Sequence, residues 1–193
     1  MIEIQDFWDE SKTVFGPKYK YSICNAKIEG DMKPLIEEIT SRDESGVNLM
    51  EFDDTSLILD AIKDMHRCYL IAKEEEELDK IFIQAKVFIQ KKGEKYEATP
   101  DVNENTSYLS GQIILQQDNS NTYYERPYST DKKTSHKIPD KEQAITIFPS
   151  WLNYSSDRVF MDAQRISINF VIITPESFAL SIPPAKKEGW VKL

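Results

Sequence analysis

Side chains that commonly hold metals or move protons are scarce in this sequence. It has two histidines, His66 and His136, and neither begins a His-x-Asp or His-x-Glu motif. Its two cysteines, Cys24 and Cys68, are far apart and form no Cys-x-x-Cys pair. Imidazole and thiolate groups are the usual ligands of transition metals. The sequence therefore predicts no ordinary transition-metal site, and we expect two free thiols in a reducing compartment.

Other catalytic motifs are also missing from the sequence. The six glycines are isolated, so there is neither a P-loop nor a dinucleotide-binding glycine motif. No Gly-x-Ser-x-Gly elbow occurs. The paired acids, Asp53-Asp54 and residues 74–77, resemble solvent-exposed charge runs. The sequence gives no support for a phosphate-loop enzyme, a serine hydrolase or a glycosidase.

The composition is that of an acidic, folded protein. The chain has 193 residues, a formal net charge of −9 and 40% hydrophobic residues, enough for a core. An acidic surface repels phosphate, so we expect no direct nucleic-acid partner, and the lysines at 91–95 and 132–137 are typical of solvated loops. The first ten residues do not resemble a signal peptide, and no apolar run is long enough to span a bilayer. We expect no membrane partner.

Helical patterns dominate the first part of the chain. A strand pattern at 18–28 is followed by the turn Gly30-Asp31 and by a helix with Pro34 in its first turn. A second helix is predicted to begin at 54–56, where each residue can act as N-cap, because apolar residues then recur every three or four positions.

Strand patterns dominate the rest of the chain. At 81–90 the apolar period changes to two, and turn residues separate further strand patterns at 108–116, 123–128, 143–148, 164–173 and 177–182. Helices followed by antiparallel strands predict an α+β chain that ends in a two-sheet jelly roll or β-helix. The expected parts are an N-terminal arm (1–18), a strand and helices that pack on the barrel (19–78), the barrel core (79–173), and a C-terminal strand and tail (174–193).

Three segments of the chain carry a resemblance to a known family. They are residues 107–115 (SYLSGQIIL), 145–152 (ITIFPSWL) and 165–170 (RISINF). In this order and at these separations they resemble the 2-oxoglutarate/iron(II) oxygenases of tailed bacteriophages. The resemblance implies a double-stranded β-helix in which a His-x-Asp or His-x-His pair before the first segment, and a histidine after the second, hold iron. It also implies that the arginine at the start of the third segment binds the far carboxylate of 2-oxoglutarate.

The sequence departs from that family at the iron ligands. The positions before the first segment hold Asp101, Asn103 and Glu104, and the position after the second holds Tyr154. Asp101, Glu104 and Tyr154 would form an all-oxygen set, which suits magnesium, calcium or ferric iron better than ferrous iron. We therefore expect no catalytic residues, no metal and no cofactor; iron and 2-oxoglutarate are expected only if the protein is an oxygenase.

Arg165 is the part of the family site that the sequence retains. One interpretation is a retained pocket for a ligand carboxylate, which would also suit a ligand-binding module without chemistry. The other is a buried structural arginine paired with an acid such as Asp162 or Glu142. The second interpretation is favoured, because a buried arginine needs a counter-charge in any case.

The leading functional hypothesis is a degenerate, non-catalytic double-stranded β-helix that serves as a structural subunit of a tailed bacteriophage particle, in its neck, tail or baseplate. It would be assembled in the host cytoplasm and reside in the virion as an oligomer bound to other protein subunits. Residues near both ends are the interface candidates, unless both ends fold back on their own domain: Phe7, Trp8, Phe15, Trp190 and Leu193. The alternative hypothesis is a divergent 2-oxoglutarate/iron(II)-type oxygenase with an unorthodox metal site.

Overall fold

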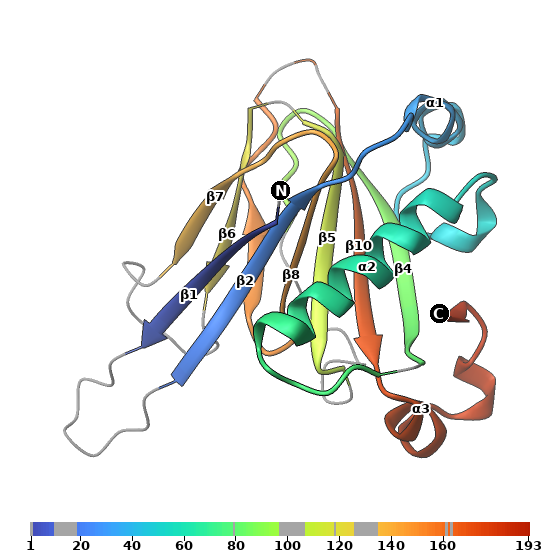
Figure 1. Ribbon diagram of the computed structural model, residues 1–193. Coiled ribbons are helices and arrows are strands. Elements are labelled where there is room, and N and C mark those ends of the chain that lie inside the picture. The colour runs from blue at the N-terminus through green and yellow to red at the C-terminus, as the bar shows by residue number, and fades with distance from the viewer. Residues whose placement is uncertain are drawn as a thin grey trace.

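The computed structural model describes residues 2–9, 19–78, 80–96, 107–117, 119–125, 135–160, 162 and 164–193. Within these ranges the protein is mostly β, with three α-helices, an eight-stranded sheet and a three-stranded sheet (Figure 1). None of the helices described is long and apolar enough to cross a membrane.

The helices and strands have the following bounds. The strands are β1 (Glu3–Asp9), β2 (Tyr19–Lys27), β3 (Val47–Asn48), β4 (Phe82–Gln90), β5 (Leu109–Gln116), β6 (Asn121–Glu125), β7 (His136–Pro139), β8 (Ala144–Pro149), β9 (Asn153–Ser156), β10 (Arg165–Ile173) and β11 (Trp190–Lys192). The helices are α1 (Lys33–Arg42), α2 (Ser56–Ala72) and α3 (Pro175–Ser181), with short 3₁₀ turns at Leu49–Glu51 and Pro184–Lys186.

The large sheet interleaves strands that are far apart in the sequence. Its order is β1-β2-β8-β5-β10-β4-β11, with β3 also paired to β4, and the small sheet has the order β7-β6-β9. The pairings in both sheets are antiparallel. The sheets pack together where Tyr124 of β6 meets Phe148 of β8, with ring centroids 4.8 Å apart. Two antiparallel sheets packed in this way form a jelly roll, as the sequence predicts.

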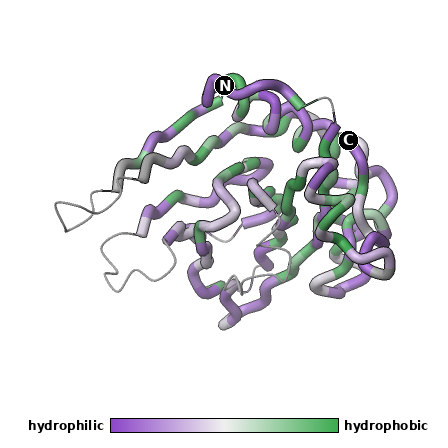
Figure 2. The backbone as a smooth tube through the Cα atoms, turned by 90° about the horizontal axis from the view of Figure 1, so that it is seen from below, coloured by the Kyte–Doolittle hydropathy of each residue, from purple (hydrophilic) through white to green (hydrophobic). Residues whose placement is uncertain are grey.

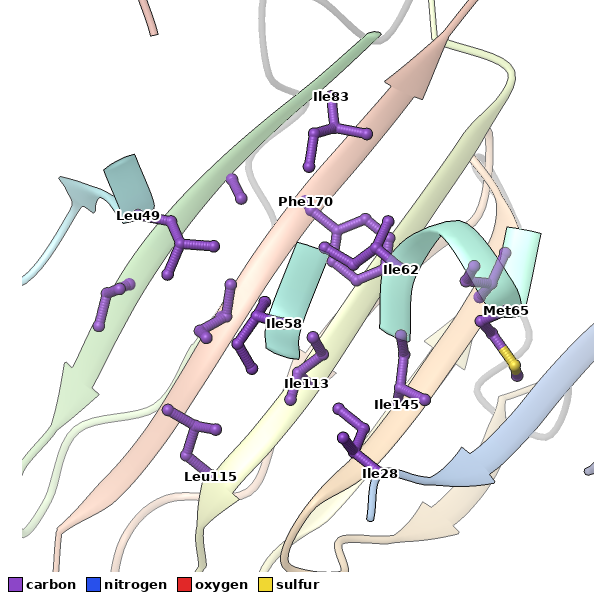
Figure 3. Close-up of a cluster of buried hydrophobic side chains, with 14 of the residues drawn as sticks. Ile28, Leu49, Ile58, Ile62, Met65, Ile83, Ile113, Leu115, Ile145 and Phe170 are labelled. Atoms are coloured by element: carbon purple, nitrogen blue, oxygen red, sulfur yellow. The ribbon is translucent and has the colours of Figure 1, made fainter. Parts of the chain in front are cut away.

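Helix α2 crosses one face of the large sheet (Figure 1) and closes the main core. Ile58 and Ile62 of α2 point at Ile113, Ile145 and Phe170 of the sheet beneath (Figure 3). Burying one such side chain stabilises the fold by about 1.5–3 kcal/mol. Figure 2 colours the backbone by hydropathy, and hydrophobic and hydrophilic residues are interspersed along it. Successive side chains of a strand point to opposite faces, and β5 and β10 are buried along almost their whole length.

Most of the predicted elements are confirmed, but their order and ends differ. The helices α1 and α2 and the strands β2, β4, β5, β8 and β10 lie where the sequence patterns place them. The expectation that helices come first is corrected, because β1 and β2 precede them. Residues 3–9 of the expected N-terminal arm form β1, which pairs along its length with β2. This part of the arm is therefore a strand of the protein's own sheet.

The strand predicted at 177–182 is wrong, because most of this segment belongs to helix α3. Thr174 is the N-cap, and its hydroxyl accepts a hydrogen bond from the Ser177 backbone N–H at 3.2 Å. Pro175 occupies the start of the helix, where its missing N–H costs nothing. Near the C-terminus, β11 adds to the edge of β4.

Candidate functional site

The space between the two sheets is lined by polar side chains of the large sheet. Gln112 of β5 and Ser167 and Asn169 of β10 alternate with apolar residues that face α2, and each is at most 7% exposed. The Gln112 amide donates to the Asn169 side-chain oxygen at 3.0 Å, and its own oxygen lies 3.1 Å from the Thr122 hydroxyl of β6. Buried polar groups of this kind need partners, so this layer is a hydrogen-bonded network.

Arg165 lies at the centre of this network. It is the first residue of β10 and its side chain is fully buried. A guanidinium has five N–H groups and no acceptor, and five side-chain oxygens surround this one. They are Asp140 Oδ2 (2.7 Å from Nε), Gln90 Oε1 (2.6 Å) and Ser167 Oγ (3.4 Å) at one terminal nitrogen, and Thr122 Oγ1 (3.2 Å) and Gln112 Oε1 (3.4 Å) at the other. The arginine is thus satisfied by the protein itself.

Asp140 supplies the counter-charge of Arg165. Its side chain is 3% exposed, and it directly follows β7 of the small sheet. The carboxylate also accepts hydrogen bonds from Ser120 Oγ at 2.8 Å and from Thr122 Oγ1 at 2.7 Å. The ion pair therefore links the large sheet to the small one, and both charges have the partners that burial requires.

The acids suggested by the sequence as partners of Arg165 are not its partners. Asp162 is 92% exposed and pairs with Lys92 at 2.8 Å, and Glu142 is exposed. The favoured interpretation of Arg165 as a buried arginine with a counter-charge agrees with the geometry, but the acid is Asp140.

Tyr154 lies on β9 among other aromatic rings. Its ring stacks on Tyr96, with centroids 5.3 Å apart, and meets Phe148 edge-on at 5.1 Å. The Tyr154 and Tyr96 hydroxyls are 3.3 Å apart. Burial and the neighbouring Tyr96 raise the pKa of Tyr154 well above its ordinary value. Tyr154 is therefore a neutral phenol that lies within this aromatic cluster.

The other candidate metal ligands are not brought together in the part of the chain that the structure describes. Asp101, Asn103 and Glu104 lie outside the described residues. His66 is buried in α2 and is hydrogen-bonded to the Tyr108 hydroxyl. The described ranges contain no group of three or more His, Cys, Asp or Glu side chains that could hold a metal ion.

A cavity of about 380 Å³ opens between the sheets beside the arginine network. Its inner wall includes Asp140, Thr122 and Gln112, which contact Arg165, together with Tyr124 and Thr146. Its other lining residues bring charges of both signs, among them Glu3, Lys27, Lys141 and Glu142. Arg165 itself does not line the cavity, because these side chains cover it.

The interface candidates that the structure describes contact their own chain. Phe7 stacks on Tyr21 at 5.4 Å and packs against His136 of β7 at 3.9 Å with its ring tilted by 35°. Trp190 meets Phe178 of α3 at 5.9 Å, and Leu193 packs against the main core. Phe15 and the side chain of Trp8 lie outside the described residues. A role of these residues in binding other subunits stays a prediction.

Sequence reasoning missed Asp140, Gln90 and Gln112. A signal exists in the strands, because Gln90 directly follows the apolar run 87–89 and Gln112 precedes the run 113–115, and both contact Arg165. Buried polar residues on an inner face mark a polar network. Asp140 carries no comparable signal, since it follows a short strand and lies 25 residues from Arg165.

Comparison with solved structures identifies the fold class. The protein resembles a Pseudomonas putida prolyl-4-hydroxylase (TM-score 0.57, 10% identity, covering 79% of this chain and 85% of that one). It also resembles a Trichoplax adhaerens prolyl hydroxylase in complex with a hypoxia-inducible-factor peptide (0.56, 11%, 83% and 87%) and the collagen prolyl hydroxylase of Paramecium bursaria Chlorella virus 1 (0.53, 13%, 79% and 95%). The sequence matches no family model and no curated protein. At these identities the likeness shows the fold, which is that of the 2-oxoglutarate/iron(II) oxygenases.

The described residues do not fit the cofactors that this fold class uses. Arg165 is in place at the start of β10, but internal acceptors take up its N–H groups. At the position where the sequence resemblance implies the last iron ligand, Tyr154 offers a phenol packed among aromatic rings in place of an imidazole. Ferrous iron together with 2-oxoglutarate is therefore not accommodated by the groups that the structure describes.

Proposed function

We propose that the protein is a divergent, oxygenase-type β-helix protein that does not bind 2-oxoglutarate through Arg165. One observation carries this proposal: the buried guanidinium already has a carboxylate partner, Asp140, and four further acceptors inside the protein. A ligand carboxylate would have to displace Asp140, whose charge would then lose its partner in a buried position.

Within this class, the comparisons favour a divergent enzyme with an unorthodox metal site. Three of the solved structures that share the fold are prolyl hydroxylases, and another is an epimerase. Asp101 and Glu104, just before β5 in the sequence, are the acids that would supply oxygen ligands. Carboxylate oxygens bind magnesium, calcium or manganese readily.

The test is a measurement of metal content and of 2-oxoglutarate turnover on the purified protein. Elemental analysis would compare the wild type with the double variant Asp101→Asn/Glu104→Gln and with the control Asp60→Asn/Glu76→Gln, whose two acids are exposed. We expect a bound metal in the wild type and in the control, its loss in the double variant, and no succinate from 2-oxoglutarate. Iron-dependent succinate formation by the wild type would overturn the proposal.

A non-catalytic role is the second candidate. It rests on the sequence, in which the positions of the family's iron ligands hold Asp101, Asn103, Glu104 and Tyr154. The protein would then be a subunit of a tailed bacteriophage particle, bound to other protein subunits and not to nucleic acid or membrane. A metal-free protein that mass spectrometry detects in purified virions would support this candidate; a stoichiometric metal in the purified protein would count against it.

A further inference from the structure

Arg165 is separated from the cavity between the sheets by a thin layer of side chains. The cavity wall includes Asp140, Thr122 and Gln112. All three also hydrogen-bond Arg165, at 2.7, 3.2 and 3.4 Å. Each of these side chains thus touches the guanidinium on one side and the cavity on the other.

Asp140 is the charged member of that layer. It is the one carboxylate in ion-pair contact with Arg165 among the residues that the structure describes. Ser120, just before β6, and Thr122 of β6 donate to its two oxygens, at 2.8 and 2.7 Å. Residues in and next to the small sheet therefore fix the position of Asp140, while its charge neutralises Arg165 of the large sheet.

The charge of Asp140 also decides what the cavity can accept. An anion that enters the cavity meets this carboxylate before it meets the guanidinium, and like charges repel more strongly at a buried group than in bulk water. Without Asp140, the same cavity would end on a buried guanidinium that lacks a counter-charge. Such a group binds a carboxylate in a charge-assisted hydrogen bond.

We propose that Asp140 is a built-in occupant of a carboxylate site and that it determines the specificity of the cavity. With Asp140 present, the cavity excludes small carboxylates; with its side chain removed, the cavity and Arg165 together form a binding site for them. This inference rests on the proposed function in one respect, namely that Arg165 is not open to a ligand. It goes further because it names Asp140 as the group that blocks Arg165 and carboxylates as the ligands that Asp140 excludes.

The test compares the wild type with Asp140→Gly, which removes the carboxylate and leaves space, and with Asp140→Asn, which removes the charge but fills the space. Thermal unfolding and calorimetry would be recorded with acetate, succinate and 2-oxoglutarate, with chloride as the control anion. We expect Asp140→Gly to unfold at a lower temperature than the wild type. The carboxylates should then raise its midpoint saturably, as a ligand that binds only the folded state does. The wild type and Asp140→Asn should not respond.

Two further measurements keep the outcome decisive. Refolding of Asp140→Gly from urea, with and without acetate, reports rescue even where little folded protein can be isolated, and acetate should raise the folded fraction. The double variant Asp140→Gly/Arg165→Met should lose the response, which places the anion at the arginine. No carboxylate effect on Asp140→Gly in either measurement would overturn the inference and leave the proposed function standing. Carboxylate binding by the wild type, lost in Arg165→Met, would overturn both.

Discussion

The Arg165–Asp140 pair is the side-chain contact with the largest expected effect on stability. Asp140→Asn leaves a charged guanidinium buried without a counter-ion, because arginine does not lose its proton in a protein. We expect the free energy of unfolding to fall by about 3–5 kcal/mol, as measured by urea denaturation. The control is Asp162→Asn, which breaks the exposed pair with Lys92 and should leave the midpoint unchanged. Equal effects of the two variants would contradict the buried pair.

His66 gives the fold a dependence on pH. Burial lowers the pKa of His66 to about 4, whereas a histidine in an unfolded chain has a pKa of about 6.5. Between these values the unfolded chain binds a proton that the folded protein does not, so stability falls as the pH is lowered from 6.5 to 4. The loss attributable to His66 should reach about 3 kcal/mol at the acid end.

Urea denaturation at a series of pH values would isolate this contribution. His66→Gln keeps a hydrogen-bonding partner for the Tyr108 hydroxyl but does not titrate. The difference in unfolding free energy between wild type and variant should therefore change across the window from pH 6.5 to 4 and be constant above it. If this difference in unfolding free energy stayed constant from pH 6.5 to 4, His66 would bind its proton equally well in the folded and unfolded states.

Among the helices and strands, those with a long periodic pattern were predictable and short ones were not. Helix α2 packs on one face and strand β10 on both faces. This packing dictates the spacing of their apolar residues, so both elements can be predicted from the sequence. The short strands β7 and β9 lack such a pattern, since their residues are mostly polar and partly exposed. In α3, the apolar residues at 177–182 predict a strand, but the segment forms a helix whose N-terminus is capped by Thr174.

The candidate site was predictable only in part, for a related reason. Arg165 stands in a recognisable motif, so its position could be assigned from the sequence. Its partner could not, because Asp140 belongs to the other sheet and comes near only when the two sheets pack. An acid close to Arg165 in the sequence, such as Asp162, does not identify its partner, because the packing of two sheets brings the paired charges together.

The contact between β5 and β10 predicts the effect of a small substitution. A Cβ atom at Gly111 would lie 2.1 Å from Cζ of Phe170 and within 2.7 Å of two more ring atoms. Gly111→Ala should therefore lower the free energy of unfolding by about 1–3 kcal/mol through overpacking. Phe170→Leu removes the ring that the alanine would meet. Gly111→Ala should therefore lower the free energy of unfolding less in the Phe170→Leu background than in the wild type. Additive losses in a denaturation experiment would argue against the close contact.

For the molecule as a whole, Phe7 tests whether the first strand serves the fold or an assembly. Its ring joins Tyr21 of the large sheet to His136 of the small one. We expect Phe7→Ala to lower the free energy of unfolding by about 1–2 kcal/mol and to leave the molecular mass in light scattering unchanged. A variant that dissociates into smaller species without losing stability would instead assign Phe7 to an interface between subunits.

The place of β10 in the large sheet bears on how the protein is made. β10 pairs with β4 on one side and β5 on the other, although both strands leave the ribosome long before it does. Until then their backbone groups have no partner at that edge, and unpaired edges of apolar strands attract other chains. Contacts between strands this far apart in the sequence also form slowly during folding. During synthesis, protection of these exposed strands by a chaperone should therefore raise the yield of folded protein.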